Sequence, residues 1–205
     1  MIKKLSLLTL LSIGSLMASN DLKPMIQIGY DFGGTTLATV EHDSYYDRSI
    51  NKIRAGQGLN LEVGAVVDTP NLELQFLIGY KFDQESASNG EVTWDLIPFS
   101  AIGMFKSNRW KFGGGLTYHL HPSLSGSFTG YDNNGDYFND KADDQYDNAF
   151  GGVAQIQYRA TENFSIGLKG TLIEYKLKKD SSVTASGDSI GVNFSYAFGG
   201  RSEFR

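Results

Sequence analysis

The sequence contains no cysteine among its 205 residues. The chain therefore has no means of forming a disulfide, a thiolate zinc site, a cysteine nucleophile or a lipidated cysteine. Charge is sparse as well, because only 20% of the residues are charged, and the net charge of -5 argues against electrostatic binding to nucleic acid. After residue 20 no segment carries an apolar stripe at helical spacing. Glycine and aromatic residues are plentiful, with 24 Gly, 13 Phe, 11 Tyr and 2 Trp.

The first segment has the layout of a secretory signal peptide. A lysine pair precedes the apolar run 5–17, and small residues around Ala18 offer a cleavage site. A membrane anchor is the weaker alternative, because about 13 apolar-leaning residues are too few to cross a bilayer as a helix. We expect a signal peptide over residues 1–18 and a domain over residues 19–205 that works outside the cytoplasm.

Period-two alternation of apolar and polar residues dominates the rest of the chain, and it predicts strands. The segment 92–105 is apolar on both faces around Pro98, so its inward side stays unassigned. The others have one apolar and one polar face. The eight predicted strands cover residues 26–32, 59–67, 72–82, 92–105, 110–121, 150–159, 164–172 and 189–198.

The connections between these segments alternate in length. Three are tight turns, and the longer polar connections fall between them. A membrane barrel sorts its connections in this way, with short turns on the periplasmic side and long loops outside, whereas a soluble sandwich has no reason to do so. The tight turns are 68–71, 106–109 and 160–163, and the long loops are 34–56, 83–90, 122–147 and 178–187.

The faces of the strands favour an apolar exterior in contact with lipid over a soluble barrel with an apolar core. The polar face carries Gly, Ser, Asn and Gln with few charges, which suits a narrow interior. About ten residues rising ~3.3 Å each and tilted near 40° span ~25 Å, the height of an outer-membrane apolar band. Aromatic residues at the strand ends would form two girdles at the lipid headgroups. The outer girdle would contain Tyr30, Phe32, Tyr80, Phe82, Trp94 and Tyr118, and the periplasmic girdle Trp110, Phe112, Tyr158, Phe164, Tyr196 and Phe198.

The last strand carries a pattern of residues that resembles the assembly signal of bacterial outer-membrane barrels. Ser189, Gly191, Phe194 and Tyr196 match its polar, glycine and two aromatic positions, although residues 199–205 continue past the usual aromatic end. The whole chain resembles the small barrels of the OmpA transmembrane-domain, OmpX and opacity-protein kind. That resemblance implies an all-β, closed eight-stranded antiparallel up-and-down transmembrane barrel in the cell outer membrane. It also implies that these four residues are read by the barrel-assembly machinery.

Six charged residues fall on the inward face by strand parity. They are Asp31, Glu62, Glu73, Lys81, Lys111 and Lys169. An eight-stranded interior is only wide enough for side chains to fill it, and unpaired charges there are costly. We therefore expect ion pairs and a plugged lumen rather than an open pore.

Two segments could carry chemistry. His119, His121 and Ser123 lie at alternate positions, which predicts that both histidines point into the lumen near its outer mouth. They could form a metal pair or part of a Ser-His hydrolase there. An enzyme acting on lipid should instead present its nucleophile toward the membrane, and no segment resembles a nucleophile elbow. A polar barrel mouth is the favoured interpretation, and neither catalysis nor a metal site is expected.

The run 132–136, followed by Asp140, Asp143, Asp144 and Asp147, has oxygen ligands at alternate positions as a calcium loop does. Its glycine is misplaced and no glutamate closes it. A solvated acidic loop is favoured, with calcium binding and contact with a host or cell-surface partner as alternatives.

The sequence thus predicts a monomeric, non-enzymatic outer-membrane surface protein that presents loops 34–56 and 122–147 and supports envelope integrity or adhesion. A narrow conduit for small or hydrophobic solutes is the alternative, and a lipid-modifying enzyme is a third. The expected partners are outer-membrane lipid and lipopolysaccharide, the assembly machinery and a surface partner. We expect no cofactor and no nucleic acid.

Overall fold

A computed structural model describes residues 22–44, 47–87, 90–131 and 137–199 of the chain. The predicted signal peptide over residues 1–18 and the tail beyond residue 199 lie outside the described residues, as does the run 132–136. Among the described residues there is no helix that is long and apolar enough to cross a membrane.

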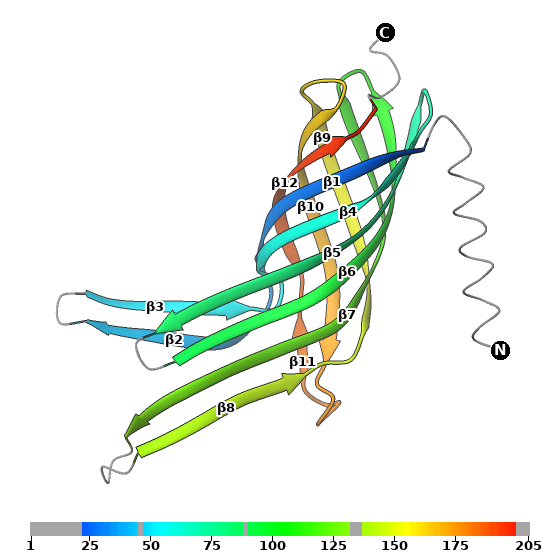
Figure 1. Cartoon of the computed structure of the whole chain (residues 1–205). Coiled ribbons are helices and arrows are strands. Elements are labelled where there is room, and N and C mark those ends of the chain that lie inside the picture. The colour runs from blue at the N-terminus through cyan, green and yellow to red at the C-terminus, as the bar shows by residue number, and fades with distance from the viewer. Residues whose placement is uncertain (1–21, 45–46, 88–89, 132–136, 200–205) are drawn as a thin grey trace.

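Eight strands form a closed antiparallel barrel (Figure 1). Each of the eight pairs with its neighbour along the chain, and the last returns to pair with the first, where Ile28 lies opposite Phe194. All eight predicted strands are present, which confirms the predicted fold. The barrel strands are β1 (Leu22–Gly33), β4 (Gly58–Asp68), β5 (Leu72–Ala87), β6 (Gly90–Ser107), β7 (Trp110–Tyr131), β9 (Ala149–Arg159), β10 (Phe164–Lys176) and β12 (Ser189–Ala197).

The three predicted tight turns lie together at one end of the barrel, the upper end in Figure 1. The Thr69 amide donates to the Leu72 carbonyl at 2.9 Å, and the Ala160 amide donates to the Phe164 carbonyl at 3.0 Å. In the third turn Asn108 has a φ of 52°, a left-handed conformation that asparagine adopts more readily than most residues. This end of the barrel is therefore closed by minimal connections.

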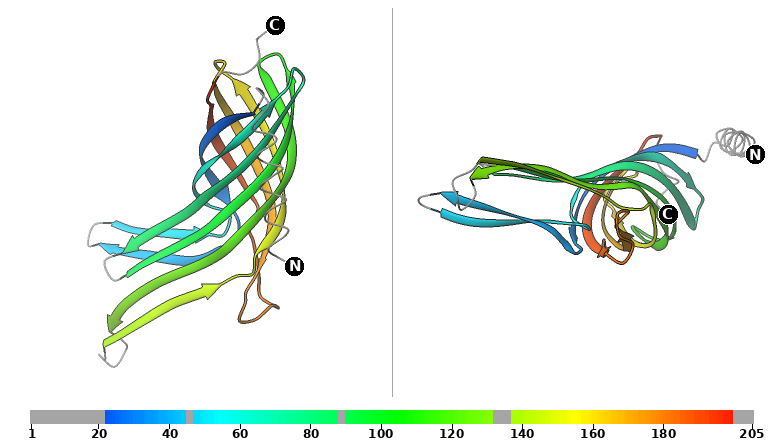
Figure 2. Two further views of the ribbon diagram at one scale, coloured as in Figure 1. Left: turned by 45° about the vertical axis from the view of Figure 1, so that its right-hand side comes forward. Right: turned by 90° about the horizontal axis from the view of Figure 1, so that it is seen from below.

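The long connections lie at the opposite end, and much of their length is regular strand rather than loop. β2 (Thr36–Ser44) and β3 (Asp47–Arg54) form a separate hairpin, β8 (Tyr137–Gln145) pairs with the outer half of β7, and β11 (Thr184–Ser186) pairs with β10. The prediction of polar loops was wrong here, because the outer halves of β5, β6 and β7 continue their pairing beyond the barrel. Figure 2 shows the resulting sheet of β5 to β8 projecting from the barrel, with the β2–β3 hairpin extending in the same direction.

The strand faces follow the predicted alternation. Along β1, Ile26, Ile28 and Phe32 are about half exposed on the outside, whereas Gln27 and Asp31 are buried inside. The same division holds along β10, where Leu168 is exposed and Lys169 is buried. The exterior is therefore an apolar surface around a mainly polar interior.

The strand β6 was left without an inward face, and the structure gives it an apolar one. Leu96, Ile102 and Met104 are buried in the interior, whereas Phe99 and Phe105 are exposed outside. Trp94 is also completely buried, so its assignment to the outer aromatic girdle was wrong. Both faces of this segment are apolar, and alternation therefore could not decide which one points inward.

Candidate functional site

The six charged residues expected in the lumen lie there as three ion pairs. None of their side chains is more than 8% exposed. Each pair joins strands separated by at least one other strand, so the pairs reach across the interior instead of along one wall. The pairs are Lys81 Nζ with Asp31 Oδ2 at 2.9 Å, Lys169 Nζ with Glu62 Oε2 at 3.1 Å, and Lys111 Nζ with Glu73 Oε1 at 2.8 Å.

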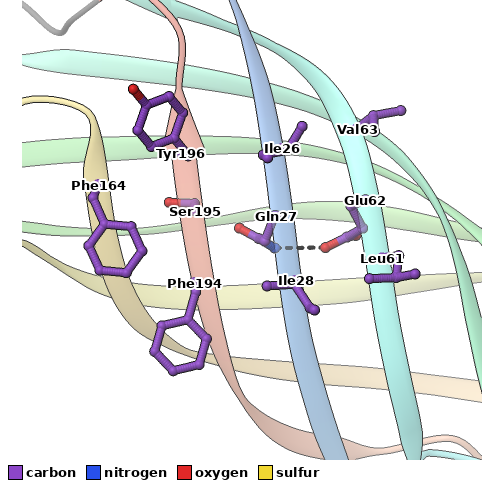
Figure 3. Close-up of a pocket in the computed structure, with 10 residues that line it drawn as sticks. All are labelled: Ile26, Gln27, Ile28, Leu61, Glu62, Val63, Phe164, Phe194, Ser195 and Tyr196. Atoms are coloured by element: carbon purple, nitrogen blue, oxygen red, sulfur yellow. Dashed lines mark hydrogen bonds between the residues drawn. The ribbon is translucent and has the colours of Figure 1, made fainter.

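Neutral amides add hydrogen bonds to two of the lumen carboxylates. Gln27 Nε2 donates to Glu62 Oε2 at 2.7 Å, as Figure 3 shows between β1 and β4. Gln75 Nε2 donates to Glu73 Oε1 at the same distance. A buried ion pair needs such additional partners to offset the loss of hydration. The sequence analysis did not single out these glutamines, although strand parity places Gln27 and Gln75 on the polar face.

Little space remains between these groups. A cavity of about 10 Å³ beside Asp31, Lys81, His119 and Lys169 has room for about one water molecule. At the tight-turn end of the barrel Asp68 is buried and accepts from the Lys106 ammonium. Buried ion pairs therefore lie within the lumen and at its tight-turn end.

An aromatic cluster closes the outer end of the barrel. The ring centroid of Trp94 lies 5.4 Å from that of Tyr146 and 5.6 Å from that of Tyr175, both in edge-on arrangements. The indole Nε1 donates to the Ala55 carbonyl at 3.1 Å, which ties the end of the β2–β3 hairpin to β6. Burial raises the pKa of the Tyr146 hydroxyl, and nearby Asp144 adds to the effect. We call Trp94, Tyr146 and Tyr175 the mouth cluster.

The two histidines singled out in the sequence do not share a site. His119 is buried, and its Nδ1 lies 2.6 Å from the Tyr175 hydroxyl beneath the mouth cluster. His121 is exposed on the other side of the wall with a φ of 49°, so its predicted inward direction was wrong. The reason is a break in register: Asp95 pairs with Ser123 and Ile97 with Leu120, which leaves two residues of β7 facing one of β6.

The Ser123 side chain forms a hydrogen bond with a carboxylate and not with an imidazole. Its hydroxyl donates to Asp95 Oδ1 at 2.8 Å on the outer surface. The two histidines that a metal pair would need are therefore separated. Across the described ranges no group of three or more His, Cys, Asp or Glu side chains is arranged to hold a metal ion. The run 132–136 of the calcium alternative lies outside those ranges, whereas Asp140, Asp143, Asp144 and Asp147 lie within them. Asp144 pairs with the Lys179 ammonium at 3.3 Å.

The four assembly-signal residues divide between the two faces of β12. Phe194 and Tyr196 are about two-fifths exposed outside, whereas Gly191 is buried and Ser189 shares its inward side. A Cβ at Gly191 would collide with Asp31 Oδ1 and lie 2.7 Å from the Tyr30 carbonyl oxygen. Gly191 therefore makes room for the Asp31–Lys81 pair, whatever its part in assembly.

No protein-family model and no curated protein sequence matches the chain. Among solved structures, Neisserial surface protein A is similar at 13% identity and a TM-score of 0.45, covering 87% of this chain and 98% of that one. The outer membrane protease OmpT from Escherichia coli is similar at 11% identity and a TM-score of 0.41, covering 88% of this chain and 98% of that one. The N-terminal β-barrel domain of Pseudomonas aeruginosa OprF is similar at 14% identity and a TM-score of 0.30, covering 85% of this chain and 97% of that one. The fold of this chain is established by its own strand pairing.

The exterior identifies the medium in which the barrel lies. Exposed apolar side chains surround the wall on every barrel strand, and a closed wall leaves no unpaired backbone to hydrocarbon. Near Ile26, Leu61 and Phe194 the apolar surface is hollowed into a groove of about 530 Å³ (Figure 3). An apolar exterior around a polar interior is the arrangement of an outer-membrane barrel. The chain is accordingly a transmembrane β-barrel of the outer membrane.

Proposed function

We propose that the chain is a monomeric, non-enzymatic surface protein whose barrel anchors an extracellular sheet in the outer membrane. The sheet consists of the outer halves of β5, β6 and β7 together with β8, and the β2–β3 hairpin packs against it. Its role is to present this rigid surface to the surroundings and to support the envelope. Lipopolysaccharide around the barrel and a cell-surface partner on the sheet are the contacts that this role requires.

The observation that carries the proposal is the filled lumen. Three buried ion pairs cross it, and the mouth cluster lies over its outer end. A conduit would need a continuous path, whereas the cavity beside Lys81 has room for about one water molecule. Separation of His119 from His121 and Ser123 also speaks against a hydrolase built from this motif.

Planar-bilayer recording of the purified full chain tests the proposal. We expect no steady conductance in 1 M salt at either polarity. The double variant Glu73→Ala/Lys111→Ala serves as the positive control, because removing both side chains opens space within the filled section. A steady conductance of the unaltered protein would contradict the plugged lumen and favour the conduit.

Lipid analysis tests the non-enzymatic part separately. Outer-membrane lipids from cells that overproduce the chain should be identical to those from cells that overproduce Ser123→Ala. A new deacylated or acylated lipid that appears only with the unaltered chain would make the protein an enzyme. We also infer that Ser189, Gly191, Phe194 and Tyr196 serve assembly, and the alternation of their faces is compatible with that role.

A further inference from the structure

A second cavity lies on the outside of the wall, at the edge of the apolar surface that is farther from the tight turns. It has a volume of about 180 Å³ and is lined by Asp95, His121, Pro122, Ser123, Gln145 and Lys178. We call it the rim cavity. It forms where β7 leaves β9 and takes β8 as its partner: His119 still pairs with Ala149, whereas Ser123 already pairs with Gln145. The two-residue bulge in β7 turns His121 outward at this junction.

Three groups of the rim cavity can donate hydrogen bonds to a ligand: the Lys178 ammonium, the His121 ring and the Gln145 amide. Both oxygens of Asp95 already accept bonds, from the Ser123 hydroxyl at 2.8 Å and from the Tyr80 hydroxyl at 3.3 Å. Lys178 Nζ donates only one long bond, at 3.4 Å, to Gln145 Oε1. Within the described part of the chain, the ring of His121 and the Nε2 of Gln145 have no partner. A ligand that supplies acceptor oxygens, and negative charge for Lys178, matches this set.

The surface on the tight-turn side of the rim cavity is the most exposed apolar part of the wall. Phe150, Leu172 and Leu116 are 73%, 69% and 64% exposed, the highest values among the large apolar side chains of the described ranges. They surround Gly152, which lies opposite Leu116 on β7 and opposite Leu172 on β10. A Cβ built on Gly152 would meet no atom within 4 Å. The missing side chain at Gly152 therefore leaves a gap among these exposed apolar side chains, and we call this gap the channel.

We propose that the rim cavity binds the phosphate-bearing headgroup of an outer-leaflet lipid, and that an acyl chain of this lipid lies in the channel at Gly152. Lys178 pairs with the phosphate, while the His121 ring and the Gln145 amide donate to its oxygens. The position of the cavity along the barrel axis fits a headgroup, because Tyr80 and Tyr118 mark the membrane interface on its tight-turn side. The site lies outside the lumen, so it is independent of whether the barrel conducts.

Native mass spectrometry of the full chain in detergent tests the site with three probes. They are phosphatidylglycerol, an uncharged galactosyl diacylglycerol with the same acyl chains, and inorganic phosphate. We expect one phosphatidylglycerol per chain to be retained in preference to the galactolipid. Lys178→Gln should weaken that binding on the order of tenfold, because it removes the charged donor. Lys179→Gln is the matched control, since the Lys179 ammonium pairs with Asp144 at 3.3 Å and should leave binding unchanged.

Gly152→Leu tests the acyl-chain part of the site. The added side chain fills the channel without meeting the wall, so it should reduce phosphatidylglycerol binding and leave the circular dichroism spectrum unchanged. Equal loss of lipid in Lys178→Gln and Lys179→Gln would overturn the proposal, as would equal retention in both. Equal binding of the galactolipid would remove the phosphate from recognition. Displacement of the lipid by millimolar inorganic phosphate would identify a free-anion site instead.

Discussion

Lys111 Nζ lies 2.8 Å from Glu73 Oε1, and neither side chain is exposed at all. The two residues come from β7 and β5, with β6 between them, so the pair crosses the interior of the barrel. Few positions in the chain test the character of the lumen as directly. A wide, wet interior would screen this pair, whereas a filled interior makes the loss of one partner expensive.

Lys111→Met should destabilise the barrel by about 3–5 kcal/mol, because the Glu73 carboxylate is then left buried without its cation. Equilibrium unfolding in detergent measures the change. Lys179→Met is the matched control: its partner Asp144 is exposed, and we expect a cost of about 0–1 kcal/mol. Adding Glu73→Gln to Lys111→Met should recover part of the loss. Equal and small effects of both lysine substitutions would show that the interior is wet.

Leu116→Arg should destabilise the barrel in lipid by about 2–4 kcal/mol if its position is near the midplane, because the guanidinium would be placed in hydrocarbon. Unfolding from phospholipid vesicles gives the value. Gln84→Arg provides the comparison on an exposed position of β5 beyond the apolar surface, where the charge reaches water. An unchanged stability of Leu116→Arg would mean that this face does not contact lipid.

Single cysteines report the orientation without background, because the natural sequence has none. Ser127→Cys, on the projecting part of β7, should react with a membrane-impermeant maleimide on intact cells. Ser107→Cys, at the turn end of the barrel, should react only after the outer membrane is opened. Both positions are exposed, so access to the reagent decides the difference. The reverse labelling pattern would show that the barrel has the opposite orientation in the membrane.

The two tryptophans should differ in their contact with lipid. Trp110 is 50% exposed on the outside, whereas Trp94 is completely buried in the mouth cluster. Brominated lipid should therefore quench the fluorescence of Trp94→Phe, in which Trp110 remains, more strongly than that of Trp110→Phe. Comparable quenching of the two variants would show that Trp94 contacts lipid, as the outer aromatic girdle requires.

Gly191→Ala should lower the stability of protein refolded in detergent by about 1–3 kcal/mol, the usual cost of overpacking. The added methyl group would collide with Asp31 and disturb its pair with Lys81. Refolding without the assembly machinery separates this effect from recognition. Undiminished stability together with poor assembly in cells would assign Gly191 to the assembly signal alone.

Much of the barrel could be predicted because a two-sided strand has a strict period. In β1 the alternation of Ile26, Gln27 and Ile28 fixes both the strand and its faces, since the side-chain period of a strand is two. The same argument gave the inward direction of Lys111 and Glu73 before any pairing was known. It failed where the period was absent or interrupted, at the apolar segment around Trp94 and at the bulge that turns His121 outward.

The sequence by itself determined the eight barrel strands, the apolar exterior and the six lumen charges, because each depends on the order of residues along one strand. Only the tertiary structure decided which lysine meets which carboxylate, because Lys169 and Glu62 are 107 residues apart and lie on strands that do not pair. It also decided that the long connections continue as strands, and that Lys178 reaches the rim beside Gln145. These contacts depend on the closure and register of the whole barrel, which no local pattern contains.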